Sequence, residues 1–200
     1  KVELYYLSLL SESVPELKSY PFPLERVNYI INNLTVDDLE SVKKIEAKTK
    51  HDVKAVELFL QSKLEPEYHS FIHFGLTSQD VNSVVYMIQI YDTITTQISP
   101  MINNLLEQIN TLAYSSDHPM VCFTHGQAAT PSNMKTQLLV FIERLCNLNK
   151  ELQDIPFRTK FGGATGGFNA HKLAYPDVDW EQFGTDFLQM INPTFQRHKY

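Results

Sequence analysis

Three short polar stretches carry residue types that could perform acid–base chemistry on an anionic substrate. Each lies at or just before an expected helix start, where unpaired N–H groups and the positive end of the helix dipole favour a bound anion. Two of them contain a histidine, whose imidazole titrates near neutral pH and can transfer protons. The stretches are TKHD at 49–52, TSQD at 77–80 and THGQ at 124–127.

Two further features could contribute to the same chemistry. His73 lies just before TSQD, and a glycine-rich stretch, GGATGGFNAH at 162–171, can bring bare backbone close to a ligand. Each feature also has an ordinary interpretation: Thr-x-x-Asp is a common helix cap, His51 could be a solvated first-turn residue, and His73 a hydrogen-bonded core histidine. The residues alone therefore indicate a helical enzyme acting on an anionic substrate, and no more.

Metal and thiol chemistry are not expected. Neither His51 nor His125 has a second His or Cys at metal-ligand spacing, so we expect no metal site and no cofactor. Cys122 and Cys146 lack a neighbouring catalytic pattern and are interpreted as packing residues. Two cysteines are too few for a disulfide framework, which favours a reducing compartment such as the cytoplasm.

The composition is that of a soluble globular protein, with 43% hydrophobic and 20% charged residues in 200. A formal net charge of -6 argues against nucleic-acid binding, because phosphate backbones require clustered Lys and Arg. No apolar run approaches the roughly 20 residues of a membrane span. The sequence begins without Met, and we interpret it as part of a longer protein.

Hydrophobic spacing predicts the helices that position these stretches. Pro131 is expected at the first position of one of them, as proline favours. Pro100 is expected to bend the helix that contains it without ending that helix, because apolar residues keep their helical spacing beyond it. A short helix is expected near 178–191. Four helix starts are predicted at threonines: Thr35, Thr49, Thr77 and Thr130.

A bundle seam is predicted behind Thr130, where apolar residues alternate by four and three over nearly three heptads. We therefore predict an all-α protein, with a small helical N-terminal domain at 1–80 and the first long helices of a central bundle at 81–200. Two long helices expose apolar faces on several sides, so further sequence, partner subunits or both must cover them. The seam residues are Met134, Leu138, Phe141, Leu145, Leu148 and Leu152.

The polar stretches resemble motifs of the adenylosuccinate lyase family, in the fumarase/aspartase superfamily. KHDVKAVE at 50–57 resembles the family's NHDVKAVE, and FIHFGLTSQDVN at 71–82 resembles FIHF-x-x-TS-(E/S)-D-(I/V)-N. THGQAATPS at 124–132 is similar to THGQPATPS. GGATGGFNAHKLAYPDVDW at 162–180 is similar to NGAVGNYNAH-x-x-AYPEVDW. These matches follow the family's order and spacing from about residue 40 onward.

The resemblance implies elimination of fumarate from adenylosuccinate and from succinylaminoimidazole carboxamide ribotide. It implies that His125 is the general acid, which protonates the departing nitrogen, and that His51 is a substrate-contacting partner. Thr77 and Ser78 would hold a substrate carboxylate at a helix N-terminus. The other residues that match positions lining the family's substrate site are Lys50, Asp52, His73, Thr124, Gln127, Asn169 and Gln196.

The resemblance also implies a homotetramer whose active sites draw on three subunits. Ala128 stands where the family usually has proline, and Gly167 where Thr or Asn is common. The family's serine loop, S-S-x-M-P-x-K-x-N-P, and its phosphate-binding Arg-Tyr pair have no match in these 200 residues. This polypeptide by itself is therefore expected to be inactive.

Two other interpretations stay open. The first is another fumarate-releasing lyase, such as argininosuccinate lyase or fumarase, although HDVKAVE and AYPDVDW argue against both. The second is a catalytically silent helical scaffold that has kept a lyase fold. Turnover of adenylosuccinate by the complete protein would distinguish them.

Overall fold

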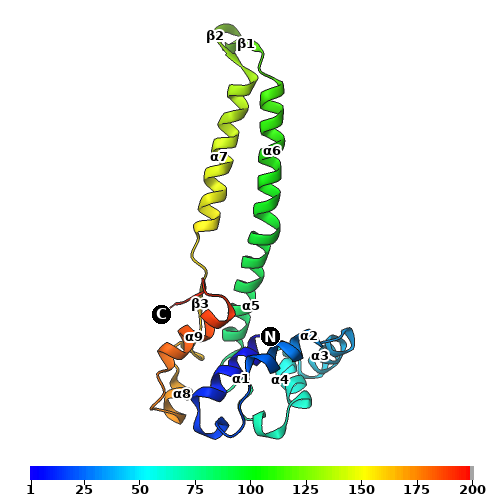
Figure 1. Ribbon diagram of the computed structural model, residues 1–200, viewed down its shortest axis with the longest axis vertical. Helices are drawn as coiled ribbons and strands as arrows, with labels where there is room; N and C mark the ends of the chain where they lie inside the picture. The colour runs from blue at the N-terminus through cyan, green and yellow to red at the C-terminus, as the bar shows by residue number, and fades with distance from the viewer. Residues whose placement is uncertain (199–200) are drawn as a thin grey trace. The chain divides into compact units, whose positions relative to one another are not determined.

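The computed structural model describes residues 1–198 and is mostly helical (Figure 1), which confirms the all-α class. The chain forms two compact units. Unit 1 contains residues 1–88 together with the residues from Pro156 onward, and unit 2 contains residues 89–155. The domain boundary expected at residue 80 stays a prediction.

Unit 1 contains short helices and one small parallel sheet. In that sheet β3 pairs with β4, with Arg158 opposite Gln196 and Lys160 opposite His198. The elements of unit 1 are α1 (Val2–Ser13), a 3-10 turn (Pro15–Leu17), α2 (Leu24–Asn32), α3 (Val36–Thr49), α4 (Asp52–Lys63), a 3-10 turn (Pro66–Tyr68), the start of α5 (Ser78–Thr93), β3 (Arg158–Lys160), α8 (Asn169–Ala174), α9 (Trp180–Ile191) and β4 (Gln196–His198).

An aromatic core holds the glycine-rich stretch in place. Phe161 and Phe168 flank its glycines, and both side chains are fully buried. Phe161 stacks on Phe187 of α9 with ring centroids 4.5 Å apart, and Tyr6 of α1 packs edge-on against both rings. Aromatic side chains bury large apolar areas, and such pairs add to that burial. The loop between Phe161 and Phe168 is therefore anchored at both ends.

The start of α3 is as the sequence predicts. Thr35 is the N-cap, its side chain accepts from the backbone N–H of Asp38, and the Asp38 carboxylate accepts from the backbone N–H of Thr35. This reciprocal pair satisfies two otherwise unpaired donors. All the atoms involved lie within four residues, so local sequence was sufficient to predict the start.

The start predicted at Thr49 is wrong. Thr49 is the last residue of α3, and Lys50 then adopts a left-handed conformation (φ 56°) that ends the helix. α4 begins only after this break, and its N-cap is His51, whose Nδ1 accepts from the Lys54 backbone N–H at 3.1 Å. A ring nitrogen thus replaces the hydroxyl that the threonine was expected to supply.

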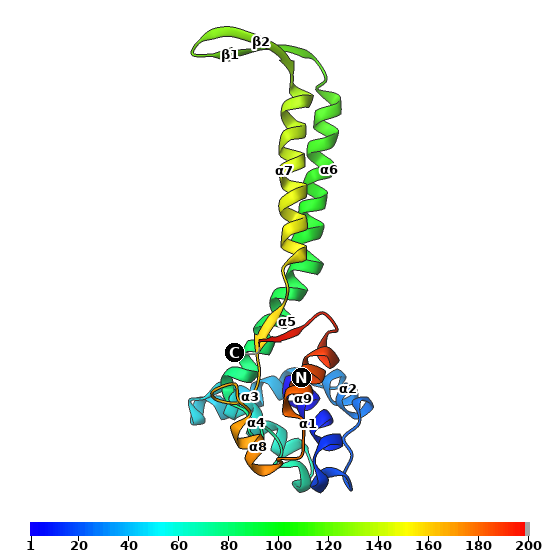
Figure 2. The ribbon, with the colours of Figure 1, turned by 90° about the vertical axis from the view of Figure 1, so that its left-hand side faces the viewer.

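Unit 2 is a helical hairpin with a β-hairpin at its end (Figure 2). The helical path continues past Pro100, as expected, through a π-helical turn at Ile94–Ile98. Proline cannot donate a backbone hydrogen bond, and a π turn accommodates such an interruption. The elements are the end of α5, the π turn, α6 (Ser99–Ser115), β1 (Pro119–Thr124), β2 (Gln127–Asn133) and α7 (Met134–Asp154).

The helix start predicted at Thr130 with Pro131 is also wrong. Both residues lie in β2, which pairs antiparallel with β1, and α7 begins at Met134 with Asn133 as its cap. The Asn133 side chain accepts from the Thr136 backbone N–H at 2.7 Å. Pro131 is tolerated because a two-stranded ribbon has only edge strands, and the register shifts just beyond its partner Val121.

The predicted seam forms two rows on α7, which packs beside α6. Leu138, Leu145 and Leu152 are half-buried. Met134, Phe141 and Leu148 are 44%, 54% and 60% exposed. In this chain, only half of the seam is therefore covered.

Candidate functional site

The N-terminal ends of α4 and α5 bring two predicted site residues together in unit 1. The Ser78 hydroxyl lies 3.1 Å from Nε2 of His51, although 27 residues separate them in sequence. Both side chains are at least partly exposed, so a ligand could reach them. Two residues that the sequence predicts for the site are therefore in direct contact.

The hydrogen bonds of His51 define its tautomer. Because Nδ1 accepts a backbone N–H from Lys54, the proton of the neutral ring is on Nε2. Nε2–H therefore donates to Ser78, and the Ser78 hydroxyl can direct its own proton to another acceptor. A carboxylate at the N-terminus of α5 would be such an acceptor, and the helix dipole would stabilise its charge.

Asp80 is a functional candidate that the sequence analysis described only as part of a helix cap. Its side chain is fully buried, and four donors surround its carboxylate. Thr77 N–H and Gly163 N–H donate to Oδ2 at 2.9 and 3.0 Å. Gly162 N–H and the Lys160 ammonium donate to Oδ1 at 3.0 and 2.7 Å. A buried carboxylate is stable only when it is paired in this way.

A cavity of about 300 Å³ lies where the turn before α5 meets the glycine-rich stretch. Gly75 contributes to the wall with a left-handed backbone (φ 67°), and a Cβ atom there would lie 2.6 Å from the His171 ring. Only glycine fits both conditions. The lining residues are Gly75, Leu76, Gly163, Ala164, Thr165, Asn169 and Ala170.

His73 pairs with a buried carboxylate that the sequence analysis did not identify. Its Nδ1 lies 2.6 Å from Oε1 of Glu3, whose side chain is 2% exposed, and the backbone of His73 is left-handed (φ 62°). Burial alone lowers the pKa of His73, but the hydrogen bond and negative charge of Glu3 outweigh it and raise the pKa above its usual value. Glu3 thus favours a protonated His73.

His171 lies in the core next to this region, and its pKa is shifted in the opposite direction to that of His73. The Tyr6 hydroxyl donates to the Phe74 carbonyl at 2.6 Å and contacts Nε2 of His171 at 2.9 Å, so that Nε2–H is the donor. Nδ1 has no hydrogen-bond partner among residues 1–198. Burial lowers the pKa of His171 to about 4, which keeps the ring neutral.

Three predicted site residues belong to unit 2. His125 and Gly126 form the two-residue turn of the β-hairpin, with φ 50° and 77°, and Thr124 pairs with Gln127 across it. Positive φ at both central residues is typical of the tight hairpin turn. His125 therefore lies in a tight turn, and the side chains of Thr124, His125 and Gln127 are all exposed.

The remaining predicted residues lie on the surface of unit 1. Lys50 and Asp52 flank His51, and Gln196 accepts from Arg158 in the small sheet at 3.0 Å. Asn169 donates to the Thr165 hydroxyl at 3.2 Å on the cavity rim. Of these residues, Asp52 contacts the His51–Ser78 pair, with its Oδ1 3.5 Å from Nδ1 of His51.

Gly167, which stands where the resembled family commonly has Thr or Asn, affects Asn169 directly. A Cβ atom at Gly167 would lie 2.8 Å from Oδ1 of Asn169, so the observed side-chain position depends on the glycine. The departure at Ala128 has a smaller consequence, because Ala128 simply pairs with Phe123 in the hairpin.

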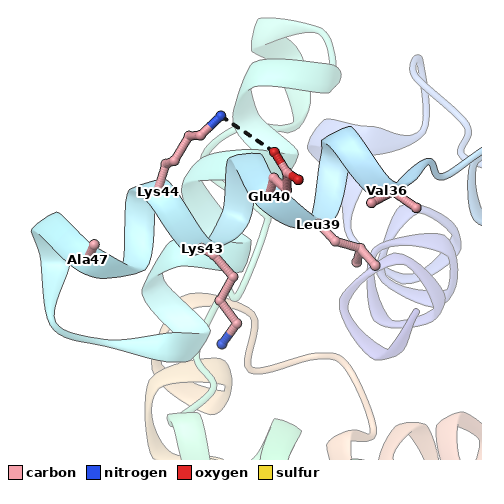
Figure 3. A pocket seen from close by; sticks show the side chains of 6 residues that line it. All are labelled: Val36, Leu39, Glu40, Lys43, Lys44 and Ala47. Carbon is pink, nitrogen blue, oxygen red and sulfur yellow. Dashed lines mark ion pairs between the residues drawn. The ribbon is translucent and has the colours of Figure 1, made fainter.

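A second hollow, of about 470 Å³, lies along α3 and is a poorer candidate (Figure 3). It is lined by one helix only, and Val36 and Leu39 remain 72% and 62% exposed. Two of its lining residues, Lys44 and Glu40, form an ion pair with each other at 3.8 Å. None of the predicted site residues lines it.

The described part of the chain contains no group of three or more His, Cys, Asp or Glu side chains that could hold a metal ion. The arrangement in unit 1 offers an imidazole, a hydroxyl and a helix N-terminus near a small cavity. Such groups bind and orient a carboxylate, and they stabilise negative charge that develops on it.

The helical fold is shared with two solved enzyme structures. A fumarate lyase from Mesorhizobium sp. BNC1 superposes with a TM-score of 0.70 at 18% identity, over 94% of this chain and 43% of that one. The 3-carboxy-cis,cis-muconate lactonizing enzyme from Pseudomonas putida gives 0.63 at 20% identity, with the same coverage. At these identities the likeness concerns the fold alone.

The chain belongs to a lyase family, because residues 24–198 match the family described as Lyase. It is 38% identical to an adenylosuccinate lyase of Dictyostelium discoideum over all of its length. It is 33% identical to that of Legionella pneumophila over 98%, and 34% identical to that of Escherichia coli K12 over 96%. The chain spans 46%, 45% and 44% of those three proteins.

Proposed function

We propose that the full-length protein is an adenylosuccinate lyase, which releases fumarate from adenylosuccinate and from succinylaminoimidazole carboxamide ribotide. The observation that carries the proposal is the His51–Ser78 pair at the N-terminus of α5, 3.1 Å apart, inside motifs that resemble that family. The names of the relatives, at 33% to 38% identity, support the same substrate class.

The chemistry is a proton abstraction followed by departure of a nitrogen. A base removes a proton from the succinyl Cβ, and the resulting carbanion is stabilised as an aci-carboxylate. Thr77 and Ser78 hold that carboxylate at the helix N-terminus, where developing charge is stabilised. His51, whose Nδ1 accepts from the Lys54 backbone N–H, keeps the Ser78 hydroxyl oriented through Nε2. The base is outside these 200 residues.

His125 supplies the proton to the leaving nitrogen. An amine leaves poorly unless it is protonated, and an imidazole that titrates near neutrality is suited to this role. The exposed hairpin turn can place His125 in the cleft of an assembled enzyme. Thr124 and Gln127 flank the turn and contact the substrate beside it, and Lys50, Asp52, His73, Asn169 and Gln196 are proposed as further substrate contacts.

The assembly is proposed to be a homotetramer with shared active sites. The exposed row of Met134, Phe141 and Leu148 on α7 supports this, because a seam row of this kind needs a facing helix. Within residues 1–198, no helix has the length and apolar character needed to cross a membrane. We propose a cytoplasmic location without membrane or nucleic-acid partners.

Incubation of the full-length protein with adenylosuccinate tests the function. We expect AMP and fumarate in equal amounts by chromatography, and their loss in His51→Gln and His125→Gln variants. Release of fumarate from argininosuccinate or malate instead would support another lyase of the superfamily. No turnover of any of these by the folded protein would support a silent scaffold.

A further inference from the structure

The Asp80 carboxylate joins two segments that are 80 residues apart in sequence. On one side it accepts from the backbone N–H of Thr77, which precedes Ser78 and the cavity-lining turn. On the other side it accepts from Gly162 and Gly163 at 3.0 Å each. Leu76 and Gly163 both line the cavity, so both segments contribute to its wall.

Lys160 completes this junction from the strand that precedes the glycines. Its ammonium lies 2.7 Å from Oδ1 of Asp80 and also donates to the Gly163 carbonyl. The side chain is 30% exposed, whereas Asp80 is fully buried. Lys160 therefore compensates a buried charge and at the same time holds the glycine loop against that charge.

The loop has a conformation that needs such a restraint. Gly162 and Gly163 have φ of 148° and 83°, and glycine loses more conformational freedom than any other residue when it is fixed. Phe161 and Phe168 anchor the ends of the loop in the core, and within the loop the Gly166 N–H donates to the Gly163 carbonyl at 3.1 Å. The bonds to Asp80 fix the first two glycines of the loop, Gly162 and Gly163, against the turn before α5.

We propose that Asp80 and Lys160 are positioning residues, which fix the distance between the Thr77–Ser78 turn and the glycine loop and so set the width of the substrate cavity. Neither side chain needs to touch the substrate. Their effect on turnover rests on the proposed lyase function, whereas their effect on the loop does not. In an enzyme, a displacement of about 1 Å can lower the rate by about 100-fold.

The experiment uses the full-length protein with Lys160→Met, which removes the ammonium and keeps the apolar part of the side chain. Lys160→Arg is the conservative variant and should restore most of the loss. Lys172→Met is the matched control, because Lys172 makes only a surface ion pair with Glu181 at 3.6 Å in the same unit. Asp80→Asn is a fourth variant. It replaces one carboxylate oxygen by an NH₂ group, which faces N–H donors that it cannot accept from.

Two measurements are made on each variant, well below its melting temperature. Hydrogen exchange by mass spectrometry, without substrate, follows peptides that cover 72–80 and 161–168. Steady-state kinetics of fumarate release give kcat and KM. For Lys160→Met we expect faster exchange in both peptides and a fall in kcat/KM of about 10- to 100-fold. Lys172→Met should match the wild type in both.

The outcomes separate this proposal from the function on which it rests. Faster exchange with wild-type kcat/KM would overturn the positioning role, and reduced kcat/KM with unchanged exchange would overturn the mechanism. A lower melting temperature alone would indicate a structural role only, and so would also overturn it. If the wild type releases no fumarate, the proposed function fails, and unchanged exchange in Lys160→Met would then overturn the restraint itself. Asp80→Asn failing to fold would leave the Lys160 variants to decide.

Discussion

The buried His171 makes a quantitative prediction about stability at mildly acidic pH. Burial lowers its pKa from 6.5 to about 4, whereas the unfolded chain keeps the ordinary value. Below pH 6.5 the unfolded state therefore binds a proton that the folded state does not. The stability from the neutral ring is complete above pH 6.5 and is lost progressively as the pH falls toward 4. Linkage between these two pKa values gives a loss of about 2 kcal/mol between pH 7 and pH 5.

His73 acts in the opposite direction and must be included. Because Glu3 raises its pKa in the folded state, His73 contributes stability below pH 6.5 that is lost as the pH rises through its folded pKa. Asp38, with a pKa lowered to about 2 by Lys63 and Thr35, titrates below this window. The pH dependence of the wild-type stability therefore combines two histidines whose contributions change in opposite directions with pH.

Urea unfolding of the full-length protein at pH 7 and pH 5, at one protein concentration, measures the effect. His171→Gln keeps an N–H donor for the Tyr6 hydroxyl but cannot titrate. Between pH 7 and pH 5, this variant should therefore lose about 2 kcal/mol less free energy of unfolding than the wild type. His73→Gln should instead lose more free energy of unfolding than the wild type over the same pH interval. Equal losses in wild type and His171→Gln, or a ring pKa of 6 or more for His171 by NMR, would refute the reasoning.

In the full-length protein, His125→Gln should lower kcat by about 10²- to 10⁴-fold with an unchanged melting temperature, because proton transfer and not packing is lost; turnover above a tenth of wild type would contradict this role. Gly75→Ala should lower the free energy of unfolding by about 2–5 kcal/mol in urea titrations, because a left-handed alanine would also press a Cβ atom against His171; a loss under about 1 kcal/mol would mean that the turn relaxes. Thr35→Ala should cost about 1 kcal/mol in the same assay, while Asp38→Glu, which keeps a carboxylate, should cost less.

Local signals in the sequence predicted those parts of the fold that local contacts stabilise. The Thr35–Asp38 capping box, the helix near 178–191 and the path past Pro100 all depend on neighbours a few residues away. The apolar alternation on α7 likewise follows from helical geometry alone. Such features need no knowledge of the rest of the chain.

The hairpin before α7 shows where local reasoning failed. Thr130 followed by Pro131 has the composition of a helix start, but pairing of β1 with β2 keeps both residues extended. A His-Gly turn between two short segments was the available signal, because positive φ at both positions favours a tight hairpin. The real cap, Asn133, is an equally good N-cap residue three positions after Thr130.

The candidate site was predictable in its residue types and not in its connections. The Ser78–His51 contact joins two helix starts, and the Glu3–His73 pair spans 70 residues. Neither partner is indicated by spacing. Glu3 in particular lies in a largely buried helix, where a buried carboxylate can be explained only once its partner is known.

The same atoms cannot both cap a helix and bind a ligand, and this division of roles determines what the site can do. At the start of α4, Nδ1 of His51 is engaged by the backbone, which leaves Nε2 to direct Ser78. At the start of α5, the buried Asp80 carboxylate accepts from four donors, among them the Thr77 backbone N–H and the Lys160 ammonium. An acidic residue in the first turn would ordinarily disfavour an anion there. The positive charge of Lys160, paired with Asp80, offsets that repulsion, and the Ser78 hydroxyl stays available to a ligand.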